Sequence, residues 1–133
     1  MNRIHAAIAC ALLTISASGC GSDRPAPPTS VNVKGTVYLD SKRVATAEIH
    51  FSVEGVPPRV MPVKDGTFAG DAPAGKNKVE VYIYVDGPPS EKYPGTVTKI
   101  NVSPERYWGA STVLGANVEE GGANEFKFDL TSE

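Results

Sequence analysis

Residues 79–85, Val-Glu-Val-Tyr-Ile-Tyr-Val, are the stretch of sequence that decides the fold. Aliphatic residues alternate with polar or aromatic ones, and this two-residue period is that of a β-strand with one buried face. The inward face is predicted to carry the aliphatic side chains of Val79, Val81, Ile83 and Val85. The outward face is predicted to carry Glu80, Tyr82 and Tyr84. The following Gly-Pro-Pro-Ser segment is predicted to end this strand.

Weaker forms of the same alternation run through the rest of the chain. They predict further strands at residues 31–39, 48–54, 59–64, 67–69, 97–102 and 126–130. Pro62 predicts that its strand lies at a sheet edge, and Asp65-Gly66 predicts a hairpin turn. Residues 103–106 predict one helical turn, and residues 109–122 a long loop. Short strands joined by turns, about seven in all, predict a single all-β domain folded as an immunoglobulin-like β-sandwich.

The N-terminal residues have the pattern of a bacterial lipoprotein signal peptide, which we predict to span residues 1–19. Arg3 precedes an apolar run at residues 6–15, which is too short to cross a bilayer as a helix. Ala17-Ser18-Gly19-Cys20 follows it with small side chains, although Ala17 stands where the pattern usually has Leu. This predicts that Cys20 is acylated and begins the mature protein. The alternative is an ordinary secreted protein in which Cys20 has no special role.

The position of Cys20 also predicts a location. Residues 20–30 are rich in proline and have no apolar periodicity, so we expect a flexible, lipid-anchored linker before a domain at residues 31–133. Cys10 lies inside the predicted signal peptide, so no disulfide is expected in the mature chain. The predicted partner is a membrane, reached through the lipid on Cys20. Because Gly21 replaces the aspartate that retains many lipoproteins in the inner membrane, we expect the outer membrane of the cell envelope.

The composition and the motifs of the sequence disfavour several classes of function. The formal net charge is −2 and no basic patch is interleaved with aromatic residues, so nucleic acid is not expected as a partner. His50 would be the only histidine of the mature chain, and one histidine cannot supply both a base and its partner. The sequence has no Gly-x-Ser-x-Gly motif and no cluster of metal-ligating residues. We therefore expect no enzyme, no metal and no cofactor, and we expect His50 on a solvated strand face.

Several short motifs resemble bacterial carboxypeptidase-regulatory-like domains. A strand with a central Gly35 runs into an Asp-Ser-Lys turn at residues 40–42, and residues 46–51 resemble the next strand of that pattern. Lys-Asp-Gly-Thr-Phe at residues 64–68 resembles the hairpin of the family, and residues 73–79 resemble the segment that leads into its long strand. The resemblance implies a transthyretin-like, prealbumin-type sandwich.

The end of the chain, residues 104–130, is also similar to that of small bacterial lipoproteins of this kind. Two departures occur: Ser41 and Val44 replace the usual Gly and Pro-Leu of the first turn, and Asn77 replaces the usual aromatic residue before the long strand. The hydroxyisourate hydrolases share the transthyretin-like fold, but this chain lacks their Tyr-Arg-Gly-Ser ending. Since such families share a scaffold more than an activity, the resemblance implies a fold and not a reaction.

A Lys–Asn isopeptide bond, which occurs in some related surface domains, would join Lys34 to Asn124. That bond needs a desolvated amine. The alternation of the first strand places Lys34 outward, in solvent, so the bond is disfavoured.

Aromatic residues suggest the remaining candidate site. Tyr82, Tyr84, Tyr107 and Trp108 are the candidate binding face, with Tyr93 as a further aromatic residue. Aromatic rings with polar tips suit glycan or protein contacts, although the same residues could simply cover the sheet. The leading hypothesis is a non-enzymatic, membrane-anchored lipoprotein that serves as a structural or interaction module. The alternatives are a glycan- or protein-binding module that uses Tyr82, Tyr84 and Trp108, and an unrecognised envelope hydrolase.

Overall fold

The strand predicted at residues 79–85 is the central part of the longest element of the fold. In the computed structural model it belongs to β6, Gly75–Pro89. The structure describes residues 26–133. The predicted signal peptide, the acylated Cys20 and most of the predicted linker lie outside the described residues.

Nine strands and two short 3₁₀-helices make up the described part of the chain, which contains no α-helix. The other strands are β1 Ser30–Leu39, β2 Lys42–Arg43, β3 Thr46–Ser52, β4 Arg59–Lys64, β5 Thr67–Pro73, β7 Val97–Asn101, β8 Leu114–Val118 and β9 Glu125–Leu130. The helices are η1 Glu105–Tyr107 and η2 Gly109–Ser111. The all-β prediction is confirmed, with more strands than were expected.

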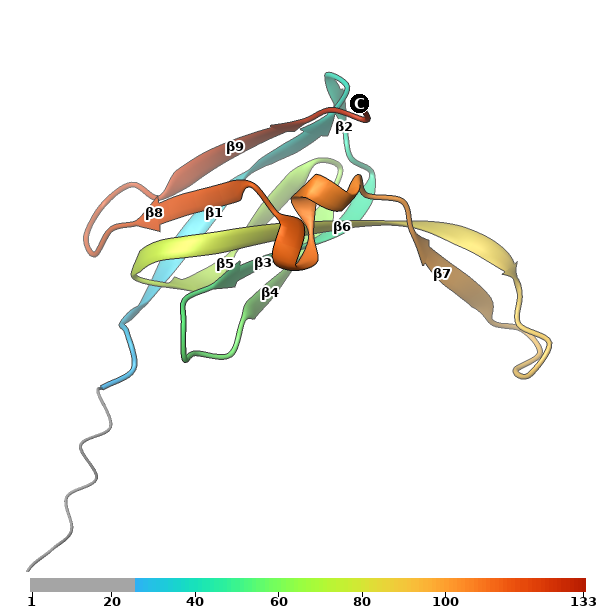
Figure 1. Cartoon of the computed structure of the whole chain (residues 1–133), viewed down its shortest axis with the longest axis horizontal. Coiled ribbons are helices and arrows are strands. Elements are labelled where there is room, and N and C mark those ends of the chain that lie inside the picture. Colours follow the sequence, from blue (N-terminus) through green and yellow to red (C-terminus); the bar gives the residue numbers. More distant parts are fainter. Residues whose placement is uncertain (1–25) are drawn as a thin grey trace, which may run out of the picture.

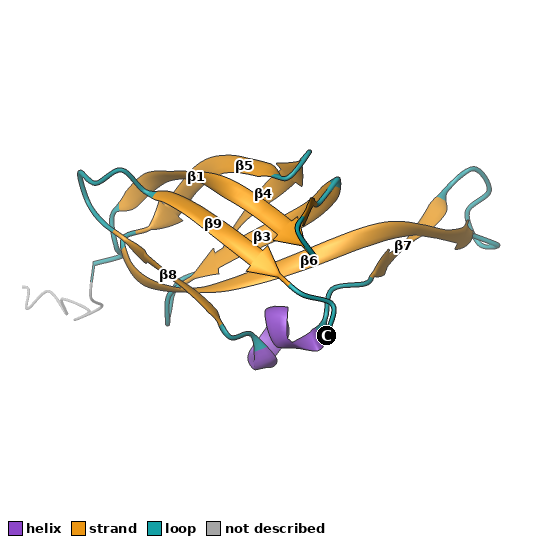
Figure 2. Ribbon diagram, turned by 90° about the horizontal axis from the view of Figure 1, so that it is seen from above, coloured by secondary structure: helices purple, strands orange, loops and turns teal. Residues whose placement is uncertain are grey.

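The strands form one curled sheet in the order β2-β1-β5-β4-β3-β6-β7, with β9 beside β1 and β8 beside β6. Neighbouring strands are antiparallel except β1 and β9, which are parallel. β4 and β5 pair only at Lys64↔Thr67, so the sheet opens between them. The edge predicted from Pro62 therefore exists along most of β4. Figure 2 shows the strands curling together at one end of the molecule, while β6 and β7 extend away from it.

The hydrophobic core lies inside the curl. Phe51 of β3 is fully buried, and its ring centroid lies 5.9 Å from that of Phe68 on β5. The centroids of Phe126 and Phe128 on β9 lie 6.0 and 6.4 Å from it. Gly35 of β1 leaves room for these rings, since a Cβ there would lie 2.0 Å from the Phe126 carbonyl oxygen and 2.7 Å from the Phe68 ring. The core thus joins strands that are not neighbours in the sheet.

The predicted faces of the long strand are correct for three of its four inward residues. Val79, Val81 and Ile83 are buried. The prediction for Val85 is wrong, because its side chain is 44% exposed. The physical reason is that β6 runs past the end of β3 at this point and is paired with β7 alone, so its inner face is only partly covered. Figure 1 shows β6 and β7 extending away from the other strands.

The segment between the helical turn and the last strand also differs from expectation. Residues 109–122 were predicted as a loop, but β8 lies within them and pairs with β6 from Gly75↔Val118 to Val79↔Leu114. The predicted helical turn exists as η1. Its expected N-cap, Ser103, instead accepts a 2.6 Å hydrogen bond from the Ile83 N–H through its hydroxyl oxygen. This bond ties the helical segment to β6.

Candidate aromatic binding face

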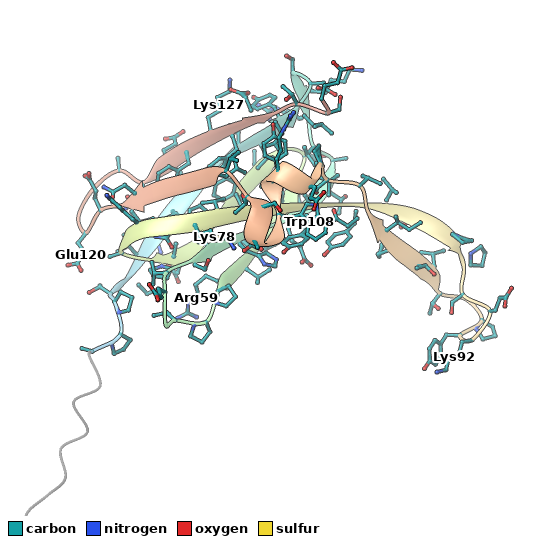
Figure 3. The ribbon with its side chains drawn as sticks, in the orientation of Figure 1. Arg59, Lys78, Lys92, Trp108, Glu120 and Lys127 are labelled. Carbon is teal, nitrogen blue, oxygen red and sulfur yellow. The ribbon has the colours of Figure 1, made fainter. Side chains whose placement is uncertain are left out.

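Three of the predicted aromatic residues meet on the outer face, the side of β3 and β6 that is turned away from the core. The ring centroids of Tyr82 and Tyr84 lie 6.5 Å apart, and those of Tyr82 and Trp108 lie 6.0 Å apart. All three side chains are half-buried. Figure 3 shows Trp108 where the short helices cross in front of β6. We call this row of Trp108, Tyr82 and Tyr84 the aromatic strip.

Local structure explains how the strip forms. Tyr82 and Tyr84 are two residues apart on one strand, so both side chains leave the same face. Trp108 comes from the link between η1 and η2, and its indole N–H donates a 3.1 Å hydrogen bond to the Ser103 carbonyl oxygen. Because the Ser103 hydroxyl is itself bound to β6 through Ile83, the indole is held against the strand.

Glu80 holds the middle ring of the strip, Tyr82, in place. Its Oε2 atom accepts a 2.6 Å hydrogen bond from the Tyr82 hydroxyl and a 3.3 Å hydrogen bond from the Gly109 N–H. Its Oε1 atom lies 2.9 Å from Lys78 Nζ, and the Glu80 side chain is only 15% exposed. Burial alone would raise the pKa of Glu80, but the hydrogen bonds from Tyr82 and Lys78 outweigh it and hold that pKa below its ordinary value.

A shallow recess adjoins the Tyr84 end of the strip. It has a volume of about 450 Å³ and is lined by Tyr84 together with polar and apolar residues of β3, β4 and β7. The lining residues that can hydrogen-bond a ligand include Thr46, Glu48, Lys64 and Lys99. Burial, followed by the charge of Glu48, raises the pKa of Tyr84. Tyr84 therefore stays a neutral hydrogen-bonding group at physiological pH.

His50 lies on this face as predicted, but it is less solvated than expected. Its side chain is 21% exposed, and its ring centroid is 4.7 Å from that of Tyr82. Its Nε2 atom lies 3.5 Å from Oε2 of Glu48, which makes an ion pair when His50 is protonated. The geometry of this contact is not that of a hydrogen bond. His50 packs against the strip and does not line the recess.

The other aromatic candidates lie elsewhere. Tyr107 is 6% exposed, and its hydroxyl accepts a 3.1 Å hydrogen bond from the Thr131 N–H. It thus packs in the core beside the end of β9. Tyr93 is 60% exposed at the tip of the β6–β7 hairpin, with Lys92 Nζ 5.6 Å from its ring centroid.

The Lys34–Asn124 geometry also argues against an isopeptide bond. Lys34 Nζ is in solvent, 3.3 Å from Glu125 Oε2. The Asn124 amide is buried and organises its own loop, because Nδ2 donates to Glu119 O at 2.9 Å and Oδ1 accepts from Glu119 N–H at 2.8 Å. The side chains make separate contacts, in agreement with the outward position predicted for Lys34.

Sequence reasoning missed three members of this site. Glu80 was assigned to the correct face, but its role in holding Tyr82 was not predicted. Glu48 and His50 come beside the strip through the register Glu48↔Tyr82 and His50↔Glu80. No local pattern in the sequence specifies that register.

Comparison with known proteins adds no relative. No family model, curated protein or solved structure matches the chain. Between residues 26 and 133, no helix is long and apolar enough to cross a membrane. In that same part of the chain, no three His, Cys, Asp or Glu residues are grouped so that they could hold a metal ion.

Proposed function

We propose that this protein is a non-enzymatic lipoprotein of the cell envelope, whose domain binds a partner through the aromatic strip. The signal pattern of residues 1–19 and the acylation of Cys20 would place it on a membrane. The residue after Cys20 favours the outer membrane. The proline-rich linker would hold the domain clear of the lipid surface.

The observation that carries the proposal is the arrangement of Trp108, Tyr82 and Tyr84 in one row. Half-exposed aromatic rings contribute large contact areas at little cost in side-chain entropy, and they are enriched in binding surfaces. The strip is also held in place before any ligand arrives, since Glu80 and Ser103 bind the polar tips of Tyr82 and Trp108. Such preorganisation lowers the entropic cost of binding.

For the scaffold we propose a transthyretin-like β-sandwich of the carboxypeptidase-regulatory-like kind. Its support is the packing of Phe51 on β3 against Phe68 and Phe128, which come from strands on the other side of the curl. Gly35 and the Asp65-Gly66 hairpin, with positive φ at both turn residues, support the motif resemblance. This proposal concerns the fold alone.

A glycan is the ligand class that the surroundings of the strip favour. Sugars present apolar ring faces together with hydroxyl groups, so they suit aromatic rings bordered by hydrogen-bonding side chains. The recess beside Tyr84 supplies such groups from Glu48, Lys64 and Lys99. Its volume of about 450 Å³ lies within the range of small-ligand sites.

The binding proposal is tested by cross-linking on intact cells that carry the native, Cys20-anchored protein, with mass spectrometry of the captured material. We expect a single abundant partner, lost in the Tyr82→Ala/Tyr84→Ala double variant. Tyr93→Ala is the matched control, because Tyr93 is exposed but lies off the strip. Scattered neighbours only, or a partner retained by the double variant, would contradict binding through the strip.

The anchor is tested separately. Cys20→Ser removes the thiol that would carry the lipid, so we expect the protein to move from the membrane fraction to the soluble fraction. Lipid labelling should disappear at the same time. Unchanged membrane association in the variant would contradict the proposed anchor and leave the binding proposal standing.

A further inference from the structure

The recess beside Tyr84 lies at a notch in the fold. Figure 1 shows the second half of β6, the connecting loop and β7, residues 84–101, extending from the body of the protein as an arm. The walls of the recess come from the beginning of β3, the end of β4 and, on the arm, Tyr84 and Lys99. Because Tyr84 also belongs to the aromatic strip, a ligand that lies on the strip can extend into the recess.

The lining of the recess is part apolar and part charged. Three of its eight residues are apolar, two carry hydroxyl groups, and three are charged. The charged residues are Glu48, Lys64 and Lys99. Lys99 is already ion-paired with Asp86, its partner in the register of β6 and β7. Glu48 and Lys64 are therefore the two charges that the recess offers to a ligand.

Glu48 and Lys64 have opposite charges but do not neutralise one another. Lys64 is paired with Thr46 on the neighbouring strand, and Glu48 is two residues beyond Thr46 on the same face. Such diagonal neighbours lie about 7–8 Å apart. In the described part of the chain, Lys64 Nζ makes no ion pair. The Glu48 side chain, 3.5 Å from His50 Nε2, is 47% exposed, so a ligand can reach it.

We propose that the recess binds an amino-acid group, with a free ammonium and a free carboxylate, that is carried by the glycan on the aromatic strip. The ammonium binds Glu48 and the carboxylate binds Lys64, each through a charge-assisted hydrogen bond. A ligand with one charge would leave one of these two protein charges without a partner, whereas a zwitterion satisfies both. This inference rests on the proposed binding role of the strip and names the substituent that its ligand carries.

Two matched probes test the inference by isothermal titration calorimetry on the full chain, in a detergent without sugar head groups. The first is chitotriose joined to the side-chain amide of asparagine, whose α-amino and α-carboxyl groups are free. The second is the same compound with the amino group acetylated and the carboxyl group amidated, which removes both charges and keeps the sugar. We expect the charged probe to bind at least about tenfold more tightly. That ratio needs only about 1.4 kcal/mol from two charge-assisted contacts.

Variants of the two charged residues locate the effect. Lys64→Gln and Glu48→Gln should each reduce the affinity ratio of the two probes below about threefold, because each removes the partner of one ligand charge. Lys34→Gln is the matched control. Lys34 is also an exposed lysine, with a side chain that is 67% exposed, but it lies outside the recess, so the ratio should stay unchanged. Free asparagine should bind at least about tenfold more weakly than the charged probe, because it lacks the sugar.

Equal affinities of the two probes for the wild type would overturn the inference, and so would binding of neither. A ratio unchanged in either glutamine variant of the recess, or lowered equally by Lys34→Gln, would also count against it. Free asparagine bound as tightly as the charged probe would show that the group is not recognised as part of a glycan. Failure of the strip itself is measured separately, by the cross-linking of the Tyr82→Ala/Tyr84→Ala variant.

Discussion

The Tyr82 hydroxyl donates a 2.6 Å hydrogen bond to Glu80, the residue two positions before it on the outer face of β6. This short bond links a carboxylate to the middle ring of the aromatic strip. The bond also contributes to a pKa shift in both residues. Burial and the Glu80 carboxylate raise the pKa of Tyr82, while the pKa of Glu80 is held below its ordinary value.

Glu80 should therefore make the free energy of unfolding of this protein depend on pH in the acid range. A carboxyl whose folded-state pKa is depressed stabilises the fold above its unfolded-state pKa of about 4.3, and this stabilisation is lost as the pH falls through the folded-state value. Glu80→Gln removes the titrating group. We expect a loss of about 1 kcal/mol at pH 7 and a smaller fall in stability between neutral and acid pH than in the wild type. Urea unfolding at a series of pH values measures both.

Glu125→Gln is the control for that experiment. Glu125 also pairs with a lysine, Lys34, but its side chain is 68% exposed. Exposed ion pairs contribute little, so its pH profile should match the wild type. An unchanged profile for Glu80→Gln would show that the Tyr82 hydrogen bond is not coupled to folding.

Gly35→Ala should be among the most damaging small substitutions in the chain. A Cβ at this position would lie 2.0 Å from the Phe126 carbonyl oxygen, and backbone cannot move aside as a flexible side chain can. Overpacking of this kind costs roughly 1–3 kcal/mol, and separation of β1 from β9 would add to it. We expect a lower midpoint in thermal and urea unfolding.

The matched control is Gly115→Ala in β8. Its added Cβ would meet only Asn77 O at 3.5 Å, an ordinary contact. Alanine also loses less backbone entropy on folding, so this variant should be neutral or slightly stabilising. Equal effects of the two substitutions would contradict the close approach of β1 and β9 at Gly35.

Sequence patterns predicted the faces of β6 but not where the core ends. Alternation reports which side chains share a face, whereas burial depends on what packs on that face. Val81 and Val85 look alike in the sequence, yet Val81 lies under the curl and Val85 lies on the arm. β8 was missed for a related reason: Leu-Gly-Ala-Asn-Val has weak strand propensity, and its pairing with β6 provides the support that propensity lacks.

In the candidate site too, the sequence did not predict which side chains are buried, and two neighbouring residues show why. Tyr107 and Trp108 are adjacent, and both were predicted on the binding face. The extended backbone of Trp108, at φ −144° and ψ 165°, follows the η1 turn and sends the two side chains apart. Tyr107 enters the core and Trp108 joins the strip. Sequence patterns do not predict such a change in backbone direction.

Tyr107→Phe tests the buried role of that tyrosine. The change keeps the ring in the core but removes the hydroxyl that accepts the Thr131 N–H at 3.1 Å. Loss of one such bond should cost about 1 kcal/mol in urea unfolding. Partner binding should be unaffected, because the hydroxyl lies away from the aromatic strip.

Tyr93→Phe is the control for this substitution. It makes the same chemical change at a side chain that is 60% exposed, so it should leave stability within about 0.5 kcal/mol of the wild type. A Tyr107→Phe variant as stable as this control would mean that the Thr131 bond contributes nothing.

Tyr82→Ala should change the fluorescence of Trp108, the only tryptophan in the chain. The Tyr82 ring, 6.0 Å from the indole centroid, covers one side of it. Its removal should admit water, shift the emission to longer wavelength and increase quenching by iodide.

Tyr93→Ala is the control, and it should change neither the emission wavelength nor the quenching, because Tyr93 lies at the tip of the β6–β7 hairpin. Equal spectra for Tyr82→Ala and the wild type would mean that the strip is not packed as described. A bound partner should have the opposite effect in the wild type, because a ligand lying across Trp108 and Tyr82 excludes both water and iodide from the indole.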